Sequence, residues 1–527
     1  MDKSFDSIII GAGIAGLVTA LELLKKGQRV LLLDAQERSQ IGGLARSAFG
    51  GMALIDTPEQ RRKGIKDSPE TALSDWLSFA EFEQDDYWPR AWAAHYVERS
   101  RADVYDYVRS LGVSFLPAVN WVERGQYTPG NSLPRYHILW GCSLRLIEKL
   151  VAQLLPYQGS RLECQFNTKV SALTRQNGRV TGCIGQCADE QLEFIAENTI
   201  VACGGFTGDI QRVKKQWPQD WQAPPPEVIL NGAHPSNDGL LHDQVARVGG
   251  NLTHMDKMWN YAAGIPHPSP SFEGQGLSLI PCKSALWLDH SGKRIVSPPL
   301  VTGFDTHQMC KQLSQLPQLY SWQLLNWRIA AKEFAISGAE HNVMIRDRKF
   351  FSLLKEILLG NHRLVRQMER ESDHFIVAPD IEQLSKKMNR LTNSEAVKPE
   401  VLHASVADYD QMVARGPSFW NDDQLRRIMQ TRQWSSDKLR TCYPKPILKD
   451  PPLIAIKVNL ISRKSLGGIQ TNLNSQVLDQ NEQAMAGLFA VGEAAGFGGG
   501  GASGKRSLEG TFLSGCILTA RQAANFL

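Results

Sequence analysis

Short apolar runs and glycine-rich turns alternate along the first 34 residues. Ser7 to Ile10 is an apolar run rich in β-branched residues, which predicts a buried parallel strand. The turn Gly11-Ala12-Gly13-Ile14-Ala15-Gly16 follows, and apolar positions then recur at helical spacing until Gly27. A second apolar run, from Arg29 to Leu33, ends at Asp34. The pattern predicts a strand, a helix and a second parallel strand.

The glycines of this turn occupy the positions that a dinucleotide site requires. Gly11 permits the tight turn, Gly13 lets the backbone approach a pyrophosphate, and Gly16 lets the helix pack closely on the strand. The free N–H groups of the helix N-terminus attract phosphate, and an acid at the end of the second strand accepts hydrogen bonds from a ribose. The expected contacts also include Ile14, Ala15, Asp34 and Ala35. The alternative is a glycine-rich turn without a ligand.

Three later segments favour FAD over NAD as the dinucleotide. Residues 200–206, with Ala202 and Gly204, form an apolar run that ends in glycines. Just upstream, Val170 lies in a predicted hairpin whose turn is Asn177-Gly178. The apolar run at 487–493 ends in Gly492-Glu493. A C-terminal segment that returns to the nucleotide fold is typical of flavoproteins.

Composition narrows the class of protein. The chain has 527 residues, a net charge of +4 and nine scattered cysteines. We therefore expect no zinc site, no disulfide framework and no nucleic-acid partner. No apolar stretch of 18 residues and no signal-peptide pattern are seen in the sequence, which favours a cytoplasmic protein without a transmembrane segment.

Several further motifs resemble a known family. The chain resembles the fumarate reductase and succinate dehydrogenase flavoproteins, and within them the 3-ketosteroid Δ1-dehydrogenase-like branch and its uncharacterised FAD-binding dehydrogenases. The resemblance is carried by Gly42-Gly43, Ser47 and Gly50-Gly51, by residues 131–141, by 234–239 with Asp238, and by 461–470, 487–496 and 508–515. Together they cover nearly the whole chain.

The resemblance implies an α/β fold with two parts. A Rossmann-like FAD-binding domain of the GR2 type is built from both chain ends, 1–261 and 446–527. An inserted α+β capping domain spans 262–445, where residues 305–325 and 381–391 have helical character. A proline-rich crossing at 446–452 suits the return to the first domain.

The same resemblance implies how FAD is held. Thr511 is the expected N-cap of a helix, with Phe512 and Leu513 in its first turn, whose positive end points at the flavin. Leu44 stands where related enzymes carry the histidine that bonds covalently to FAD, so we expect noncovalent FAD.

The residues expected to bind the substrate differ from those of the fumarate reductases and from those of the steroid dehydrogenases. The expected fumarate-binding arginines are missing, since the cap stretch after Arg294 lacks one and Ser507 stands at the C-terminal position, although Arg506 is adjacent. Arg463 and Lys464 replace two family histidines. Phe497 stands where steroid dehydrogenases place a tyrosine, so it has no hydroxyl to offer.

The remaining catalytic candidates are therefore Tyr261, Arg463, Lys464 and Arg506. Tyr261 could polarise a substrate carbonyl, and the alternative is that it is a packed aromatic side chain. The three cationic residues could bind an anionic substrate, and the alternative for Arg463 and Lys464 is that they are solvated on a turn. His137 is more easily explained as structural than as a proton shuttle.

We interpret the protein as an FAD-dependent dehydrogenase. It would transfer a hydride between a carbonyl-activated CH–CH group of a small, possibly ketosteroid-like substrate and flavin N5, with an unidentified electron acceptor. The alternatives are a fumarate or enoate reductase and a non-catalytic flavin-binding redox sensor.

Overall fold

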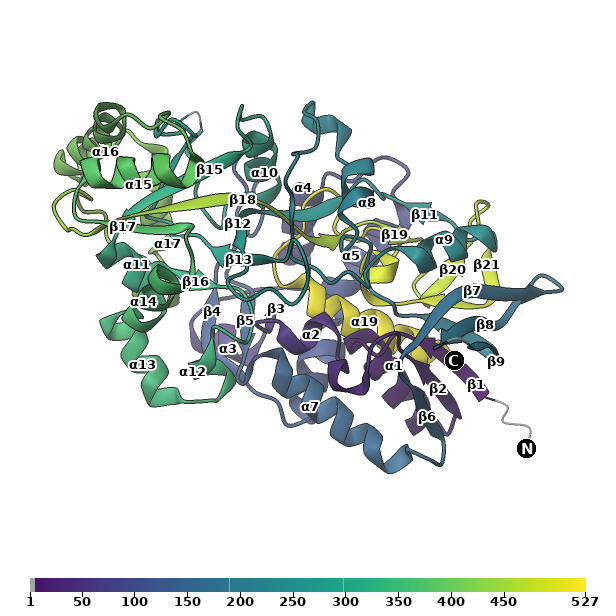
Figure 1. Ribbon diagram of the computed structural model, residues 1–527. Helices are drawn as coiled ribbons and strands as arrows, with labels where there is room; N and C mark the ends of the chain where they lie inside the picture. Colours follow the sequence, from purple (N-terminus) through teal and green to yellow (C-terminus); the bar gives the residue numbers. More distant parts are fainter. Residues whose placement is uncertain (1–4, 189, 297) are drawn as a thin grey trace.

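Two large sheets organise the computed structural model, which describes residues 5–188, 190–296 and 298–527. Figure 1 shows that the strand that begins at Phe5 and the helix that ends near the C-terminus lie together at the first sheet, and that residues from the middle of the chain form the opposite end of the molecule. The α/β fold class is confirmed. Two smaller sheets complete the strands: β3 (Gly51–Ala53), β5 (Tyr136–Leu139) and β4 (Phe115–Asn120) in one, β11 (Leu252–Thr253) and β19 (Gly468–Ile469) in the other.

The first sheet has parallel strands from distant parts of the chain at its centre. β1 pairs in parallel with β2 and β9, and β9 pairs in parallel with β21. In order, its strands are β20 (Gln476–Leu478), β21 (Ala484–Ala490), β9 (Glu190–Val201), β1 (Phe5–Ile10), β2 (Val30–Leu33) and β6 (Leu162–Gln165), with β7 (Thr168–Gln176) and β8 (Arg179–Cys187) beside β9. The predicted hairpin is confirmed: β7 and β8 pair antiparallel, and Asn177 and Gly178 have φ values of 49° and 82°.

Helices cover this sheet because its strands are apolar on both faces. α1 packs against α19, and residues of both are buried in one core with Ile9 and Leu32. The predicted first helix is confirmed and ends before Gly27, whose φ is 91°. The helices up to the second sheet are α1 (Ile14–Lys25), α2 (Leu44–Ser47), α3 (Pro58–Arg62), α4 (Pro69–Ala80), α5 (Tyr87–Arg99), α6 (Asp106–Ser110), α7 (Cys142–Leu154), α8 (Ile210–Lys215) and α9 (Leu240–Arg247).

The second sheet is mainly antiparallel and is centred on β18, a 13-residue strand. Its strands are β14 (Leu286–Leu288), β15 (Tyr320–Asn326), β18 (Leu453–Ser465), β12 (Met258–Pro266), β13 (Gly276–Ile280) and β16 (Ala335–Ile336), with β10 (Leu230–Asn231) and β17 (Phe375–Ala378) also paired to β18. β12 runs across the expected boundary at residue 261, and β18 follows the one at 446.

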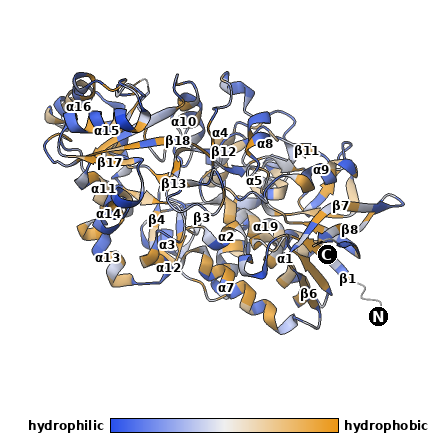
Figure 2. Ribbon diagram, viewed as in Figure 1, coloured by the Kyte–Doolittle hydropathy of each residue, from blue (hydrophilic) through white to orange (hydrophobic). Residues whose placement is uncertain are grey.

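Helices pack around this second sheet and make the outer end of the molecule. They are α10 (Thr306–Ser314), α11 (Trp327–Glu333), α12 (Val343–Arg346), α13 (Phe350–Leu359), α14 (His362–Glu371), α15 (Ile381–Thr392), α16 (Pro399–Ala414), α17 (Asp423–Thr431) and α18 (Ser435–Arg440), and α19 (Thr511–Phe526) returns to the first sheet. Figure 2 shows mainly hydrophobic strands and more hydrophilic outer helices such as α15.

One helix prediction in this region is confirmed and one is partly wrong. The pattern at 381–391 forms α15. The pattern at 305–325 forms α10 only to Ser314, and Tyr320 begins β15. A strand forms here because residues 321–326 are buried and pair along β18, so tertiary context overrides the helical spacing of the local sequence. Of the described helices, not one has both the length and the apolar character needed to cross a membrane.

Candidate active site

The carboxyl ends of β1, β2, β9 and β21 meet at one edge of the first sheet. In open α/β sheets ligands bind at this edge. β1 is followed by the glycine-rich turn, β2 by Asp34, β9 by residues 202–205 and β21 by Gly492-Glu493. The structure thus brings together the predicted nucleotide contacts from both chain ends.

The three glycines of the first turn have different surroundings. A Cβ at Gly11 would lie 2.4 Å from the Ala202 carbonyl oxygen, and one at Gly16 would lie 1.9 Å from that of Gly11. A Cβ at Gly13 would meet no atom within 4 Å. Protein packing therefore explains Gly11 and Gly16, whereas the space at Gly13 fits the approach of a pyrophosphate.

The N-terminus of α1 borders this space. Gly13 is its N-cap, and no side chain caps the helix, so its first N–H groups remain available to phosphate. Gly13 also forms a bridge with Gly42, and Gly43 has a φ of 54°. Asp34 accepts hydrogen bonds from the backbone N–H of Ala12 (2.6 Å) and Gln36 (2.7 Å), which fix its carboxylate beside the turn.

The second glycine pair, Gly50-Gly51, lies next to Tyr136. A Cβ at Gly51 would lie 1.9 Å from the Tyr136 hydroxyl oxygen, so the phenol lies directly on this glycine. A Cβ at Gly510 would lie 3.0 Å from the ring of Tyr136 and 2.6 Å from the backbone nitrogen of Ala53. β3, β5 and the start of α19 therefore converge at Tyr136.

The N-cap of α19 differs from the expectation. Gly510, with a φ of 99°, is the N-cap, and Thr511 is the first helical residue. The hydroxyl of Thr511 donates backward to the Leu508 carbonyl (2.9 Å) and so caps no N–H. Thr511 as N-cap was wrong because a left-handed residue is needed there, and glycine adopts that conformation without strain. The helix N-terminus remains without a side-chain cap.

Arg463 and Lys464 lie in β18, not on a solvated turn. The Lys464 ammonium is 4.9 Å from the centre of the Phe512 ring, in the first turn of α19. Burial, together with the positive charge of Arg463, lowers the pKa of Lys464. Next to it, the backbone N–H of Ser465 donates to the buried Glu493 carboxylate at 3.0 Å, and burial raises the pKa of Glu493.

Two charged groups of opposite sign act on Tyr261. The guanidinium of Arg463 lies 5.4 Å from the centre of its ring and donates to the Ser337 hydroxyl. Burial and the negative charge of Glu509 raise the pKa of the Tyr261 phenol. The same two causes raise the pKa of Tyr136 well above its usual value. Both phenols therefore stay protonated at neutral pH and can donate hydrogen bonds.

Glu123 is a buried acid that the sequence interpretation missed. It is 2% exposed, and its carboxylate accepts from the Thr306 hydroxyl (2.6 Å) at the start of α10. Burial, with a smaller contribution from the charge of Glu509, raises its pKa to about 8. Such a group can hold or release a proton near neutral pH.

Glu509 and Tyr136 were also missed as individual residues, although both lie in segments that carry the family resemblance, 508–515 and 131–141. Glu509 follows Leu508 in the segment already singled out, and it is half-buried. Tyr136 lies in the predicted loop next to His137. His137 is structural: its Nε2 bonds the Thr57 hydroxyl and its Nδ1 bonds the Arg135 carbonyl.

Two further predicted residues, Arg506 and Asp238, form ion pairs within the protein. Arg506 pairs with Asp305 (3.1 Å) and with Glu81 (2.5 Å), so its charge is already balanced. Asp238 pairs with Lys169 (2.8 Å), next to Val170. Their roles toward ligands stay predictions.

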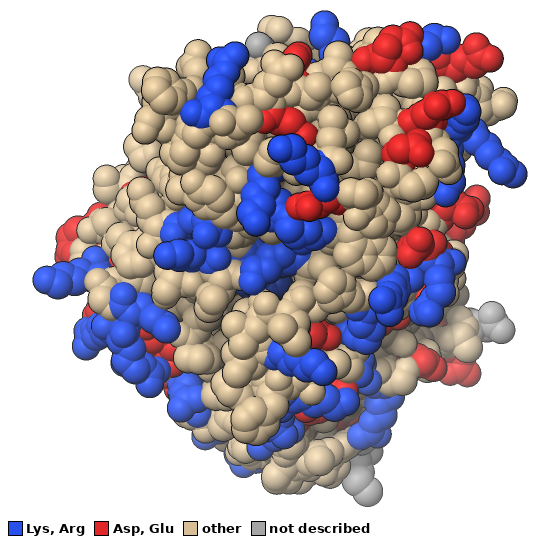
Figure 3. All heavy atoms as spheres, turned by 90° about the vertical axis from the view of Figure 1, so that its left-hand side faces the viewer, with Lys and Arg blue, Asp and Glu red and all other residues tan. Residues whose placement is uncertain are grey.

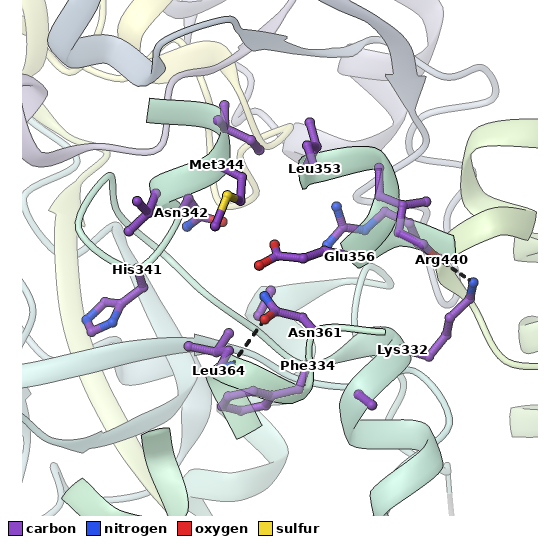
Figure 4. Close-up of a pocket in the computed structure, with 15 residues that line it drawn as sticks. Lys332, Phe334, His341, Asn342, Met344, Leu353, Glu356, Asn361, Leu364 and Arg440 are labelled. Atoms are coloured by element: carbon purple, nitrogen blue, oxygen red, sulfur yellow. Dashed lines mark hydrogen bonds between the residues drawn. The ribbon is translucent and has the colours of Figure 1, made fainter. Parts of the chain in front are cut away.

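Two other features lie among the elements around the second sheet. His267, Glu340 and His341 place possible metal-ligating atoms within 4.8 Å of one another, but His267 Nδ1 accepts from the Ser269 N–H, so its proton belongs on Nε2. A pocket of about 40 Å³ lies among α11–α14 and α18, with Glu356 and Asn361 pointing into it (Figure 4). Ligand pockets usually enclose several hundred Å³, so this pocket is too small to be a substrate site.

Comparison with known proteins decides the family. The family model described as "FAD binding domain" matches residues 6–513. The chain belongs to this family. A KsdD-like steroid dehydrogenase of Mycobacterium tuberculosis (strain CDC 1551 / Oshkosh) is 38% identical, over 98% of this chain and 94% of its own. One of Mycolicibacterium smegmatis is 36% identical, over 96% of each chain.

Solved structures agree on the fold. 3-Ketosteroid Δ1-dehydrogenase from Sterolibacterium denitrificans superimposes with a TM-score of 0.73 at 15% identity, covering 99% of both chains. A flavocytochrome c3 fumarate reductase superimposes with a TM-score of 0.68 at 20% identity, covering 99% of this chain and 78% of the other. The predicted family, FAD as cofactor and the class of FAD-dependent dehydrogenase are confirmed. The open space at Gly13 and the uncapped starts of α1 and α19 fit this cofactor.

Proposed function

We propose that this FAD-dependent oxidoreductase dehydrogenates the CH–CH bond next to a ketone in a steroid-like substrate. The arrangement that carries the proposal is the group of Tyr136, Tyr261 and Glu509 at the start of α19, beside Arg463. The steroid class is supported by the relatives at 36–38% identity, which are named KsdD-like steroid dehydrogenases.

Each residue has a distinct role in this proposal. Bound FAD supplies the acceptor for the hydride that leaves the β-carbon. The neutral phenol of Tyr261 donates a hydrogen bond to the substrate carbonyl, which acidifies the neighbouring α-C–H. The Glu509 carboxylate accepts the α-proton, and Arg463 offsets the negative charge that develops on the carbonyl oxygen. Lys464 and the N-terminus of α19 provide positive potential at the flavin side.

The two arginines that a fumarate reductase uses to donate a proton and to hold a substrate carboxylate are not found at their family positions in this sequence. Arg506, the arginine beside the family position, is balanced by Asp305 and Glu81. A free arginine fork is what a dicarboxylate would need. The arrangement therefore favours a steroid-like ketone over fumarate as the substrate.

Anaerobic mixing of the FAD-loaded protein with 3-ketosteroids, acyl ketones and dicarboxylates tests the proposal. A saturated 3-ketosteroid should bleach the oxidised-flavin absorbance within the mixing series, and a dicarboxylate should not. Reduction by dithionite alone would instead favour a non-catalytic flavoprotein, and bleaching by the acyl ketones alone would refute the steroid class.

Tyr261→Phe should slow flavin reduction on the order of 10²-fold, because the hydrogen bond to the carbonyl is lost. Tyr320→Phe is the matched control: it lies in the same sheet, with its ring 4.6 Å from the Lys457 ammonium. Both variants should bind FAD like the wild type. An unchanged rate for Tyr261→Phe would remove this residue from the reaction.

A further inference from the structure

Helix α13 (Phe350–Leu359) exposes an unusual amount of apolar surface. Phe351 is 84% exposed, Leu359 66%, Leu358 58%, Phe350 49% and Leu354 41%. Most other exposed large apolar side chains of the described residues are scattered singly over different elements, which is ordinary for a protein surface. A contiguous group on one short helix is not ordinary and indicates an interaction site.

The exposed group is a second apolar stripe beside the one that anchors the helix. Leu353 is buried and Ile357 half-buried in a small core with Trp140. Residues 350, 354 and 358 follow at helical spacing next to this inner stripe. The helix is thus fixed to the molecule along one edge, while its neighbouring face is directed outward.

The surroundings of this face are positively charged. Residues 343–366 hold six Lys or Arg against two Asp or Glu, a local charge of +4 that equals the net charge of the whole chain. Arg348, Lys349, Lys355, Arg363 and Arg366 are all exposed. Figure 3 shows the end of the molecule that carries these helices, where Lys and Arg predominate over its middle and lower parts.

We propose that α13 docks this protein on the surface of an anionic lipid bilayer. Phe351, Leu354 and Leu358 would enter the boundary between headgroups and acyl chains, while the flanking cations contact anionic headgroups. Apolar residues on one face with Lys and Arg around them are the pattern of interfacial helices, and stable attachment needs both signals together. The length of a helix does not decide whether it can lie in the interface; its apolar face and its charged surroundings do.

Charge complementarity favours this occupant over a second copy of the chain. A symmetric contact of α13 with itself would bring together two faces of charge +4, and like charges across an interface oppose association. A bilayer with anionic headgroups removes this repulsion. The proposal goes beyond the proposed reaction and does not depend on it.

Vesicle co-sedimentation of the FAD-loaded protein tests the proposal. The probes are vesicles of phosphatidylglycerol with phosphatidylcholine, and vesicles of phosphatidylcholine alone, each with a protein sample lacking vesicles as reference. We expect the protein to bind the anionic vesicles, and we expect this binding to weaken at least tenfold in 0.5 M salt. At that concentration the Debye screening length is on the order of a few Å.

Leu358→Glu and Phe351→Ser should each reduce vesicle binding at least tenfold. Ile195→Glu is the matched control, since Ile195 is 62% exposed on β9, at the other end of the molecule (Figure 1). Bound FAD and flavin reduction by dithionite, measured for all variants, show that each is folded. Binding lost equally in the Ile195→Glu control would overturn the proposal.

Two further results would overturn it. One is the absence of binding to either vesicle at low salt. The other is a wild-type dimer in sedimentation velocity that Leu358→Glu converts to a monomer, because the apolar face would then be covered by a second copy.

Discussion

Replacement of Glu123 by Gln should remove a pH dependence from the stability of this protein. Glu123 is buried, and its pKa rises from 4.5 to about 8 on folding because burial disfavours the charged form. Gln has the same shape and can still accept the hydrogen bond from Thr306, which lies 2.6 Å away. The substitution therefore removes the titration and keeps the packing.

The sign and size of the effect follow from proton linkage. Below pH 4.5 both the folded and the unfolded states bind the proton, so the stabilisation is complete. As the pH rises toward 8 the unfolded state releases its proton first, and the free energy of unfolding falls by about 1.4 kcal/mol per pH unit. Between pH 5 and pH 8 the wild type should lose about 4 kcal/mol relative to Glu123→Gln.

Urea unfolding of both proteins with saturating FAD, at pH 5, 6, 7 and 8, measures this difference. Glu193→Gln, an exposed glutamate of β9, is the matched control and should follow the wild type. If the Glu123→Gln and wild-type curves run parallel over this range, Glu123 ionises normally and the argument from burial fails.

Three other outcomes are expected. Gly13→Val should weaken FAD binding at least tenfold with little change in apoprotein melting temperature, whereas Gly11→Ala should lower melting without FAD, because its Cβ would lie 2.4 Å from the Ala202 carbonyl oxygen; equal effects in both assays would contradict this. Acid precipitation should release all the FAD into the supernatant, since Leu44 cannot form a bond to it; yellow pellets would refute noncovalent binding. The His254 imidazole, though partly desolvated, has a raised pKa because its Nε2 lies 2.6 Å from an Asp86 oxygen. Its stabilisation is complete below the unfolded pKa and lost as pH rises through the folded one, so His254→Gln should lower stability by about 1 kcal/mol at pH 6 and less at pH 9; thermal melting at both values would refute this if the loss were constant.

The nucleotide-binding turn and its neighbouring helix could be predicted from the sequence because they depend on residues that are close together in the chain. A tight turn, a close helix–strand contact and a helix start all depend on residues within a few positions of one another, as at Gly11, Gly13 and Gly16. The Asn177-Gly178 hairpin was predictable for the same reason, since two adjacent positive φ values restrict the residue types.

The residues that can donate or accept protons near the proposed substrate site could not be predicted in the same way. Glu123, Tyr136, Tyr261 and Glu509 come from four separate segments, and only the fold gives them a common environment. The pKa of Glu123 depends on burial, which no short sequence pattern encodes. The N-cap of α19 was missed because Thr511 suits the usual side-chain rule, while the chain there needs the left-handed conformation of Gly510.

The length of β18 has a mechanical consequence. Its first residues pair with β15 and β17, while the side chains of Arg463 and Lys464 near its other end lie over the rings of Tyr261 and Phe512. Thirteen extended residues span about 40 Å, so this one strand connects the part of the second sheet at β15 and β17 with the residues of the proposed catalytic site. Tyr261 lies where the pairing of β12 with β18 changes register, and such irregularities bend a strand locally. A displacement of the distant part of the sheet would therefore shift the residue that is proposed to hold the substrate carbonyl.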